Sequence, residues 1–215
     1  MSEKLVEYSF YLTYAFLVTT GTITFIEAIR TKNDSMRHIL NLETCISIVA
    51  AFFYGKFVTE FDKPVIDYKE INLNRYVDWA ITTPIMLLVL ILAFKYNSTN
   101  NAQVKFTDYL IILVLNYGML GSGYMGDLGK IDRLSATIIG FLFFGGLYFF
   151  LYNNYLRQNK SNQLLYGIFF VLWSLYGVFY QMEQKARNIG YNILDLFSKC
   201  FVGIYFWAYF TKIFN

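Results

Sequence analysis

The chain has 215 residues, of which 56% are hydrophobic, 20% aromatic and only 15% charged, with a formal net charge of +3. A soluble domain ordinarily carries about 25% charged residues, so this composition argues against a soluble fold. The basic residues are scattered rather than clustered, which argues against a nucleic-acid partner.

Seven apolar segments follow one another, each close to the roughly 20 residues that a helix needs to cross a bilayer. They cover residues 8–29, 38–59, 76–95, 106–125, 135–156, 163–182 and 191–214. Most connections are short, including residues 185–190 before the last segment. Residues 60–74 are longer, and their alternating charges suggest a small hairpin or lid. We predict an all-α fold, a seven-transmembrane-helix bundle with short loops, with residues 1–215 as one membrane domain.

The N-terminal residues 1–7 carry three charges and lead directly into a full-length apolar segment. A cleavable signal peptide would show a short apolar region and a small-residue cleavage site. Neither is visible, so residues 8–29 are expected to be the first helix of the mature protein. Cys45 and Cys200 both lie inside apolar segments and form no metal motif, so neither a structural disulfide nor a metal site is expected.

Charged residues occur inside two of the apolar segments. Arg75 and Asp78 lie near the start of the third, and Asp195 and Lys199 lie in the seventh, four residues apart and therefore on one helix face. Each such charge costs roughly 2.5–3.5 kcal/mol at the centre of a membrane helix, so it indicates function. The types and depths of these residues predict a buried charge cluster.

A lysine in a dry pocket has two explanations. Burial disfavours its ammonium form, and the neutral amine can form a Schiff base with a carbonyl ligand, which then needs a carboxylate counterion. Asp78 and Asp195, with Arg75 between them, would balance that charge. Alternatively, Lys199 belongs to a salt bridge that locks the third helix to the seventh. The residue types alone leave both explanations open.

Aromatic residues favour a ligand beside this cluster. Tyr76 and Trp79 flank Asp78, and Trp173 and Tyr176 are three residues apart, so both can face one pocket. Such aromatics are more often simple packing. A narrow helical wall next to them would suit a flat, rigid polyene, and the residues that make it narrow are Asn116, Gly118, Met119, Gly121 and Gly123.

Three stretches together resemble the microbial (type 1) rhodopsins, the seven-helix retinal-binding family. They are Arg75-Tyr76-x-Asp78-Trp79-x-x-Thr82-Thr83-Pro84, Trp173-Ser174-x-Tyr176 and Asp195-x-x-x-Lys199, on the third, sixth and seventh helices in the order of the family. The resemblance spans the full chain. The short chain, trimmed loops and a glutamate in the second helix, Glu43, resemble the rhodopsins that giant viruses of algae and protists encode.

The resemblance implies a role for each residue of the cluster. Lys199 would carry all-trans retinal as a Schiff base, Asp78 would be the primary counterion and proton acceptor, and Asp195 the second counterion. Arg75 would be the gate toward the release side, and Thr82 would hydrogen-bond Asp78. The residues implied to contact retinal are Tyr76, Trp79, Thr83, Met86, Met119, Gly123, Trp173 and Tyr176.

Two departures from the archetypal pumps concern proton supply and helix bending. Val89 stands where those pumps have a proton-donating carboxylate, and Gly177 where they usually have proline. Glu43 would replace the lost donor from the cytoplasmic mouth, roughly 10–15 Å from Lys199; it could instead be a helix-start carboxylate. Glu183 would be either an outer proton-release group or simply solvated.

The leading prediction is a light-driven outward proton pump rather than an enzyme. A light-gated ion channel is the first alternative, although the places of the algal channels' glutamate and asparagine hold Ala50 and Cys200. A photosensor with a separate partner is the second. The expected partners are the lipid bilayer, protons and further copies of the chain, as a trimer or pentamer. Charge alone does not decide the orientation; the resemblance implies an extracellular N-terminus and a cytoplasmic C-terminus.

Overall fold

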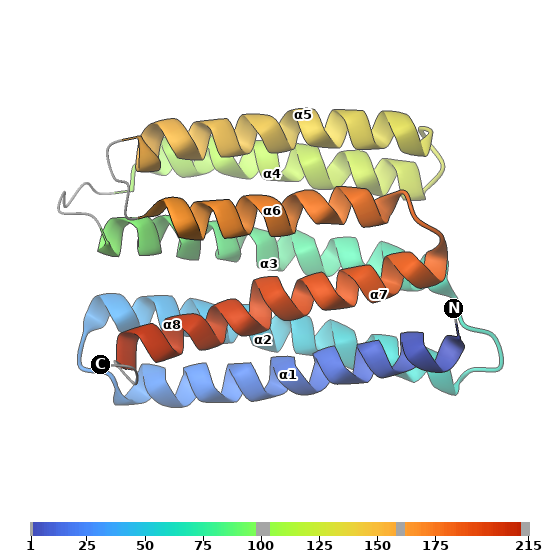
Figure 1. Cartoon of the computed structure of the whole chain (residues 1–215), viewed down its shortest axis with the longest axis horizontal. Coiled ribbons are helices and arrows are strands. Elements are labelled where there is room, and N and C mark those ends of the chain that lie inside the picture. Colours follow the sequence, from blue (N-terminus) through green and yellow to red (C-terminus); the bar gives the residue numbers. More distant parts are fainter. Residues whose placement is uncertain (1, 98–103, 158–161, 212–215) are drawn as a thin grey trace.

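A computed structural model describes residues 2–97, 104–157 and 162–211. Long helices lie side by side in these residues, and the first and last described residues lie at opposite ends of the bundle (Figure 1). The described part contains no strand. Six helices are long and apolar enough to cross a membrane, as judged by length and composition, and a seventh, interrupted helix completes the bundle. The predicted all-α, seven-helix fold is confirmed.

The helices run as follows. The first five rods are α1 (Glu3–Arg30), α2 (Asp34–Thr59) with the short 3-10 helix η1 (Glu60–Asp62), α3 (Tyr68–Tyr96), α4 (Phe106–Asp127) and α5 (Arg133–Leu151) with the π-helix η2 (Tyr152–Leu156). The sixth is α6 (Gln163–Tyr180), and the seventh consists of α7 (Gln184–Asp195), the π-helix η4 (Leu196–Phe201) and α8 (Val202–Thr211).

Two predicted connections were wrong. Residues 60–74 form no hairpin: η1 follows α2, and α3 begins at Tyr68, capped by the Asp67 side chain, which accepts a hydrogen bond from the Glu70 amide. Residues 185–190 belong to α7, where the buried Arg187 and Asn188 are paired with Asp127 of α4 and Asn72 of α3. The predicted connections at 97–104 and 157–162, and the last segment beyond residue 211, lie partly outside the described residues.

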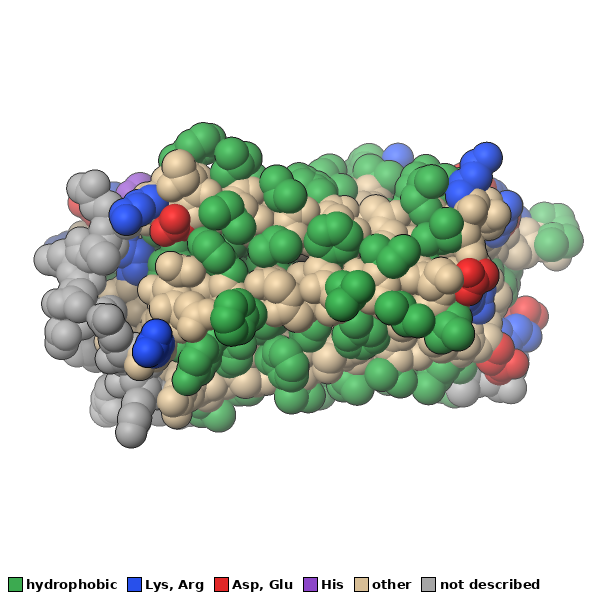
Figure 2. Space-filling view, turned by 90° about the horizontal axis from the view of Figure 1, so that it is seen from above, with side chains coloured by type: hydrophobic (Ala, Val, Ile, Leu, Met, Phe, Trp, Pro, Cys, Tyr) green, Lys and Arg blue, Asp and Glu red, His purple; other side chains and the backbone are tan. Residues whose placement is uncertain are grey.

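The outer surface suits a bilayer. Figure 2 shows hydrophobic side chains along the length of one face of the bundle, with charged side chains at its two ends. Large apolar residues such as Leu142, Phe149 and Val114 are exposed on α4 and α5. Because helices satisfy their own backbone hydrogen bonds, such a bundle can lie in a solvent that offers none.

A proline in the middle of α3 fixes how this helix meets α4. Pro84 has no amide hydrogen, so the Ala80 carbonyl, four residues earlier, lacks its usual helical partner. The hydroxyl of Tyr117 on α4 donates to that carbonyl at 3.0 Å, and Tyr109 donates to the carbonyl of Pro84 at 2.9 Å. These two bonds hold α4 beside the stretch of α3 that carries Asp78 and Thr82.

Candidate functional site

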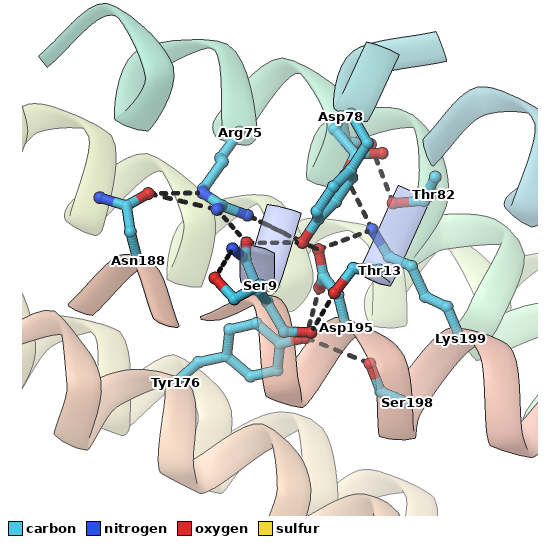
Figure 3. Close-up of polar contacts among 12 residues, drawn as sticks. Ser9, Thr13, Arg75, Asp78, Thr82, Tyr176, Asn188, Asp195, Ser198 and Lys199 are labelled. Carbon is cyan, nitrogen blue, oxygen red and sulfur yellow. Dashed lines mark hydrogen bonds and ion pairs between the residues drawn. The ribbon is translucent and has the colours of Figure 1, made fainter. Parts of the chain in front are cut away.

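The structure brings the four predicted charges together at the centre of the bundle (Figure 3). Lys199 lies on η4, and its Nζ donates a hydrogen bond to Oδ2 of Asp78 at 2.7 Å. The same Nζ lies 3.5 Å from Oδ2 of Asp195, which in turn lies 3.8 Å from Arg75. All four side chains are at most 1% exposed. Two cations therefore balance two anions away from the surface of the protein.

The two carboxylates have unequal surroundings. Asp195 accepts hydrogen bonds from the hydroxyls of Tyr54 at 2.9 Å and Tyr176 at 2.5 Å. Asp78 accepts from Lys199 alone, and its Oδ1 has no hydrogen-bond partner among the described residues. The hydroxyl donors stabilise Asp195 as an anion, whereas Lys199 is the one donor to the Asp78 carboxylate among the described residues.

Thr82 lies beside Asp78 but contacts it differently from the implied geometry. Its hydroxyl donates to the backbone carbonyl of Asp78 at 2.9 Å, not to the carboxylate. A threonine inside a helix commonly bonds back to the carbonyl four residues earlier. Thr83 does the same with the Trp79 carbonyl at 2.7 Å.

Arg75 does not lie between the two aspartates. Its guanidinium donates to Tyr54 at 3.1 Å, to Asn188 at 3.2 Å and to Asn192 at 2.5 Å. Asn188 continues the network toward the N-terminal end of α7, where its amide donates to Asn72. The half of the bundle that extends from Lys199 through Arg75 to Asn72, which we call the Arg75 half, thus contains a row of hydrogen-bonded side-chain amides.

A cavity of about 120 Å³ adjoins Lys199, between α3, α4, α5, α6 and the α7–η4 segment. Every residue implied to contact retinal lines it: Tyr76, Trp79, Thr83, Met86, Met119, Gly123, Trp173, Tyr176 and Lys199 itself. The wall is mainly aromatic and apolar, with charges at the Lys199 end.

Glycines shape the wall where aromatic rings approach it. A Cβ at Gly123 would come within 2.7 Å of the Tyr76 hydroxyl, and one at Gly177 within 2.6 Å of the Phe141 ring. Gly121, also predicted to narrow α4, has no side chain within 4 Å of such a Cβ. Of the predicted α4 glycines, only Gly123 lines the cavity.

Glu43 is buried, whereas Glu183 is exposed to solvent. Glu43 is 2% exposed and more than two turns inside α2, whose N-cap is Asn33, so it is not a helix-start carboxylate. It makes no hydrogen bond or ion pair in the described part of the chain. Glu183 is exposed at the N-cap position of α7, and its side chain makes no capping bond.

Several residues of the site were missed from the sequence. Tyr54 lies in the apolar run of residues 50–55, and no polar pattern there distinguishes it from the other aromatic residues. Asn188 and Asn192 were readable, because they are spaced four residues apart and fall on the helical face that leads to Asp195 and Lys199. A second ion pair was also missed: Arg187 donates two hydrogen bonds to Asp127, and both side chains are at most 6% exposed.

A seven-helix membrane bundle with a buried lysine, a paired carboxylate and an adjoining aromatic cavity defines the class of the microbial rhodopsins. The family model for bacteriorhodopsin-like proteins matches residues 4–213, so the chain belongs to this family. Within it the chain is of the viral group: it is 71% identical to the viral rhodopsin OLPVRII, with a TM-score of 0.92 over 98% of this chain and 100% of that one.

Other relatives are more distant. The green-light absorbing proteorhodopsin of Gamma-proteobacterium EBAC31A08 is 26% identical over 93% of this chain and 84% of its own length. The structure of the light-driven proton pump of Coccomyxa subellipsoidea is 18% identical, with a TM-score of 0.80 and 97% of both chains covered, which shows a shared fold.

Retinal is the cofactor of this family and of this chain, held through a lysine Schiff base. The residues present fit it. Among the lysines that the structure describes, Lys199 alone is buried, and its Nζ lies at the end of the cavity. The glycine at position 123 leaves the width that a Cβ would fill.

Proposed function

We propose that the protein is a light-driven outward proton pump in which Asp78 takes the proton from Nζ of Lys199. One observation carries this proposal: Nζ donates to Asp78 at 2.7 Å, and the second oxygen of that carboxylate is without a partner in the described residues. Asp195 is held as an anion by its two tyrosine donors and serves as the second counterion.

Retinal, when bound, supplies the absorption of light and a change of shape beside Nζ. The residues of the chain bind and transfer the proton. Lys199 holds the proton in the dark, and Asp78 accepts it. Arg75, which lies beyond Asp195, connects this cluster to the side-chain amides of Asn188 and Asn192. Trp79, with its ring edge-on to Tyr176 at 5.4 Å, keeps the wall of the cavity rigid around the cofactor.

The two halves of the bundle differ in the way that one-directional transport needs. The Arg75 half is polar as far as Asn72 and Gln184. The opposite half, which we call the Glu43 half, is filled between α3 and its neighbours by an apolar cluster that includes Leu87, Val89 and Leu90. A proton on Asp78 therefore has an easier path toward the Arg75 end.

The orientation and assembly follow the family resemblance. We propose that the Arg75 end and the N-terminus face outward, that the C-terminus is cytoplasmic, and that the chain assembles as a trimer or pentamer. Native mass spectrometry of the protein in lipid nanodiscs measures the copy number, and a monomer would contradict the assembly. We propose Glu183, which is exposed at the Arg75 end, as a proton-release group at the protein surface.

Light-induced acidification tests the direction of transport. In an unbuffered suspension of cells that express the protein with retinal, light should lower the external pH, and a protonophore should abolish the change. Alkalinisation would reverse the proposed direction. A channel would only let external pH follow the existing gradient, and a photosensor would leave it unchanged.

Glu43 is proposed as the donor that returns a proton to Nζ of Lys199, in place of the carboxylate absent at Val89. A buried acid without an ionic partner is favoured in its neutral form and so has a proton to give. Glu43→Gln should leave the visible band nearly unchanged and slow its recovery after a flash, in a pH-dependent way. Azide, a diffusible proton carrier, should restore the rate. A recovery equal to that of the wild type at every pH would remove Glu43 from the mechanism.

A further inference from the structure

Two buried hydroxyls near Glu43 have no role in the site described above. Thr20 on α1 and Ser47 on α2 are both 0% exposed; the Ser47 hydroxyl has no hydrogen-bond partner among the described residues, and the Thr20 hydroxyl has only the weakly bonding Cys200 thiol within reach. Their neighbours differ: Thr24 bonds the Thr20 carbonyl at 2.9 Å and Thr44 bonds the Leu40 carbonyl at 2.8 Å. A buried hydroxyl left without a partner is costly, and ordered water commonly satisfies such groups.

Thr20 and Glu43 lie together at one glycine of the last helix, and Ser47 lies beside them on α2. A Cβ at Gly203 would come within 2.8 Å of the Thr20 methyl and 3.2 Å of Oε2 of Glu43. Ser47 lies four residues after Glu43, on the same face of α2, and its Cβ faces Gly21 of α1. Glycine at 203 therefore lets α8 approach α1 and α2 while leaving their polar groups room.

The same place reaches the residue that follows the lysine in the chain. Cys200, the residue after Lys199, is buried, and its thiol faces Thr20. Polar groups therefore extend from Glu43, past Thr20, to the residue next to Lys199, along the junction of α1, α2 and α8. On the α3 side of this half, by contrast, Leu87 and Leu90 are at most 1% exposed and belong to the apolar cluster.

We propose that Thr20 and Ser47 hold ordered water at this junction, which we call the α1–α2–α8 junction, and that this water is the route from Glu43 to Nζ of Lys199. The route rests on the proposed donor role of Glu43. In the transfer, the O–H bond of Glu43 breaks as a water O–H bond forms, and that water passes a proton onward to Nζ. Glu43 is left as a carboxylate, and no electrons are exchanged.

The water site is tested first in the dark. The carboxyl C=O stretch of Glu43, identified by its loss in Glu43→Gln, is measured by infrared spectroscopy on the purified protein with retinal. Thr20→Val and Ser47→Ala should each shift this stretch to higher wavenumber, because the carboxyl loses hydrogen-bonded water. Thr44→Val is the matched control: its hydroxyl already has a partner, so the stretch should not move. An unmoved stretch in both test variants overturns the water site.

The route is tested by flash kinetics in variants that keep the dark visible band. Thr20→Val and Ser47→Ala should slow recovery of the band several-fold, and Gly203→Ala, which fills the junction, should do the same. Combining Thr20→Val with Glu43→Gln should add no further slowing, since both act on one path. Slowing by Glu43→Gln with wild-type rates in the other variants overturns the route and leaves the donor role standing. Wild-type recovery in Glu43→Gln overturns the donor role, and the route with it, whatever the infrared result.

Discussion

The Nζ of Lys199 lies 2.7 Å from Oδ2 of Asp78, and the second oxygen of that carboxylate has no hydrogen-bond partner in the described structure. Asp195 lies 3.5 Å from the same Nζ, but two tyrosine hydroxyls donate to it. The two carboxylates beside one lysine thus differ in their hydrogen bonds, and this difference supports the different roles that we propose for them.

Replacing Asp78 by asparagine should abolish light-driven acidification and shift the visible band to the red. The negative charge near Nζ stabilises the dark state, so its loss lowers the excitation energy. Thr82→Val is the control, because the Thr82 hydroxyl bonds the backbone of Asp78 and not its carboxylate. Absorption spectra should show little change in Thr82→Val, and a red shift as large as that of Asp78→Asn would contradict this geometry.

Lys199→Ala should leave no visible band when all-trans retinal is added to the purified apoprotein. The wild type should form a band that hydroxylamine bleaches, as expected of a Schiff base. Lys56→Ala, which removes an exposed lysine of α2, should form the band normally. Full colour in Lys199→Ala would place the cofactor on another residue.

A methyl group at Gly123 should narrow the cavity. The new Cβ would come within 2.7 Å of the Tyr76 hydroxyl, and that ring must move toward the space the cofactor uses. Gly123→Ala should therefore slow the appearance of the visible band on addition of retinal. Gly121→Ala is matched to it, because nothing lies within 4 Å of a Cβ at that position. Equal rates in the two variants would show that Gly123 does not set the width.

The ion pair between Arg187 and Asp127 should contribute strongly to stability. Removing one partner of a buried pair leaves an uncompensated charge, at a cost of about 3–5 kcal/mol. Asp127→Asn should lower the midpoint of denaturant unfolding, and Asp127→Asn with Arg187→Gln should recover part of the loss. Lys185→Ala removes an exposed pair with Glu3 and should cost no more than about 1 kcal/mol. Similar losses in both single variants would mean that the Arg187 pair is not buried in the membrane protein.

Residue spacing was enough to predict the centre of the site. Asp195 and Lys199 are one turn apart, and their charge inside an apolar run required a partner, which Asp78 supplies. The start of α7 could not be predicted, because Arg187 and Asn188 have the polarity of a loop. Their partners, Asp127 and Asn72, lie 60 and 116 residues away in the chain, so only the fold reveals that these polar groups are satisfied inside the bundle.

The direction of the Thr82 hydroxyl and the depth of Glu43 were also beyond the sequence. A threonine four residues after an aspartate can reach either its carboxylate or its carbonyl, and the helix geometry decides between them. Glu43 could have been a helix-start residue, but α2 begins nine residues earlier, at Asp34, which places the glutamate among buried groups.

The most direct test of the pump is the photocurrent under voltage clamp, with proton gradients imposed in both directions. A pump driven by light works against the gradient, so the current should stay outward at every accessible membrane potential. Asp78→Asn should carry no such current. A photocurrent that reverses sign with voltage would contradict the account and make the protein a light-gated channel. The absence of any current from a fully coloured protein would contradict it equally and point to a photosensor.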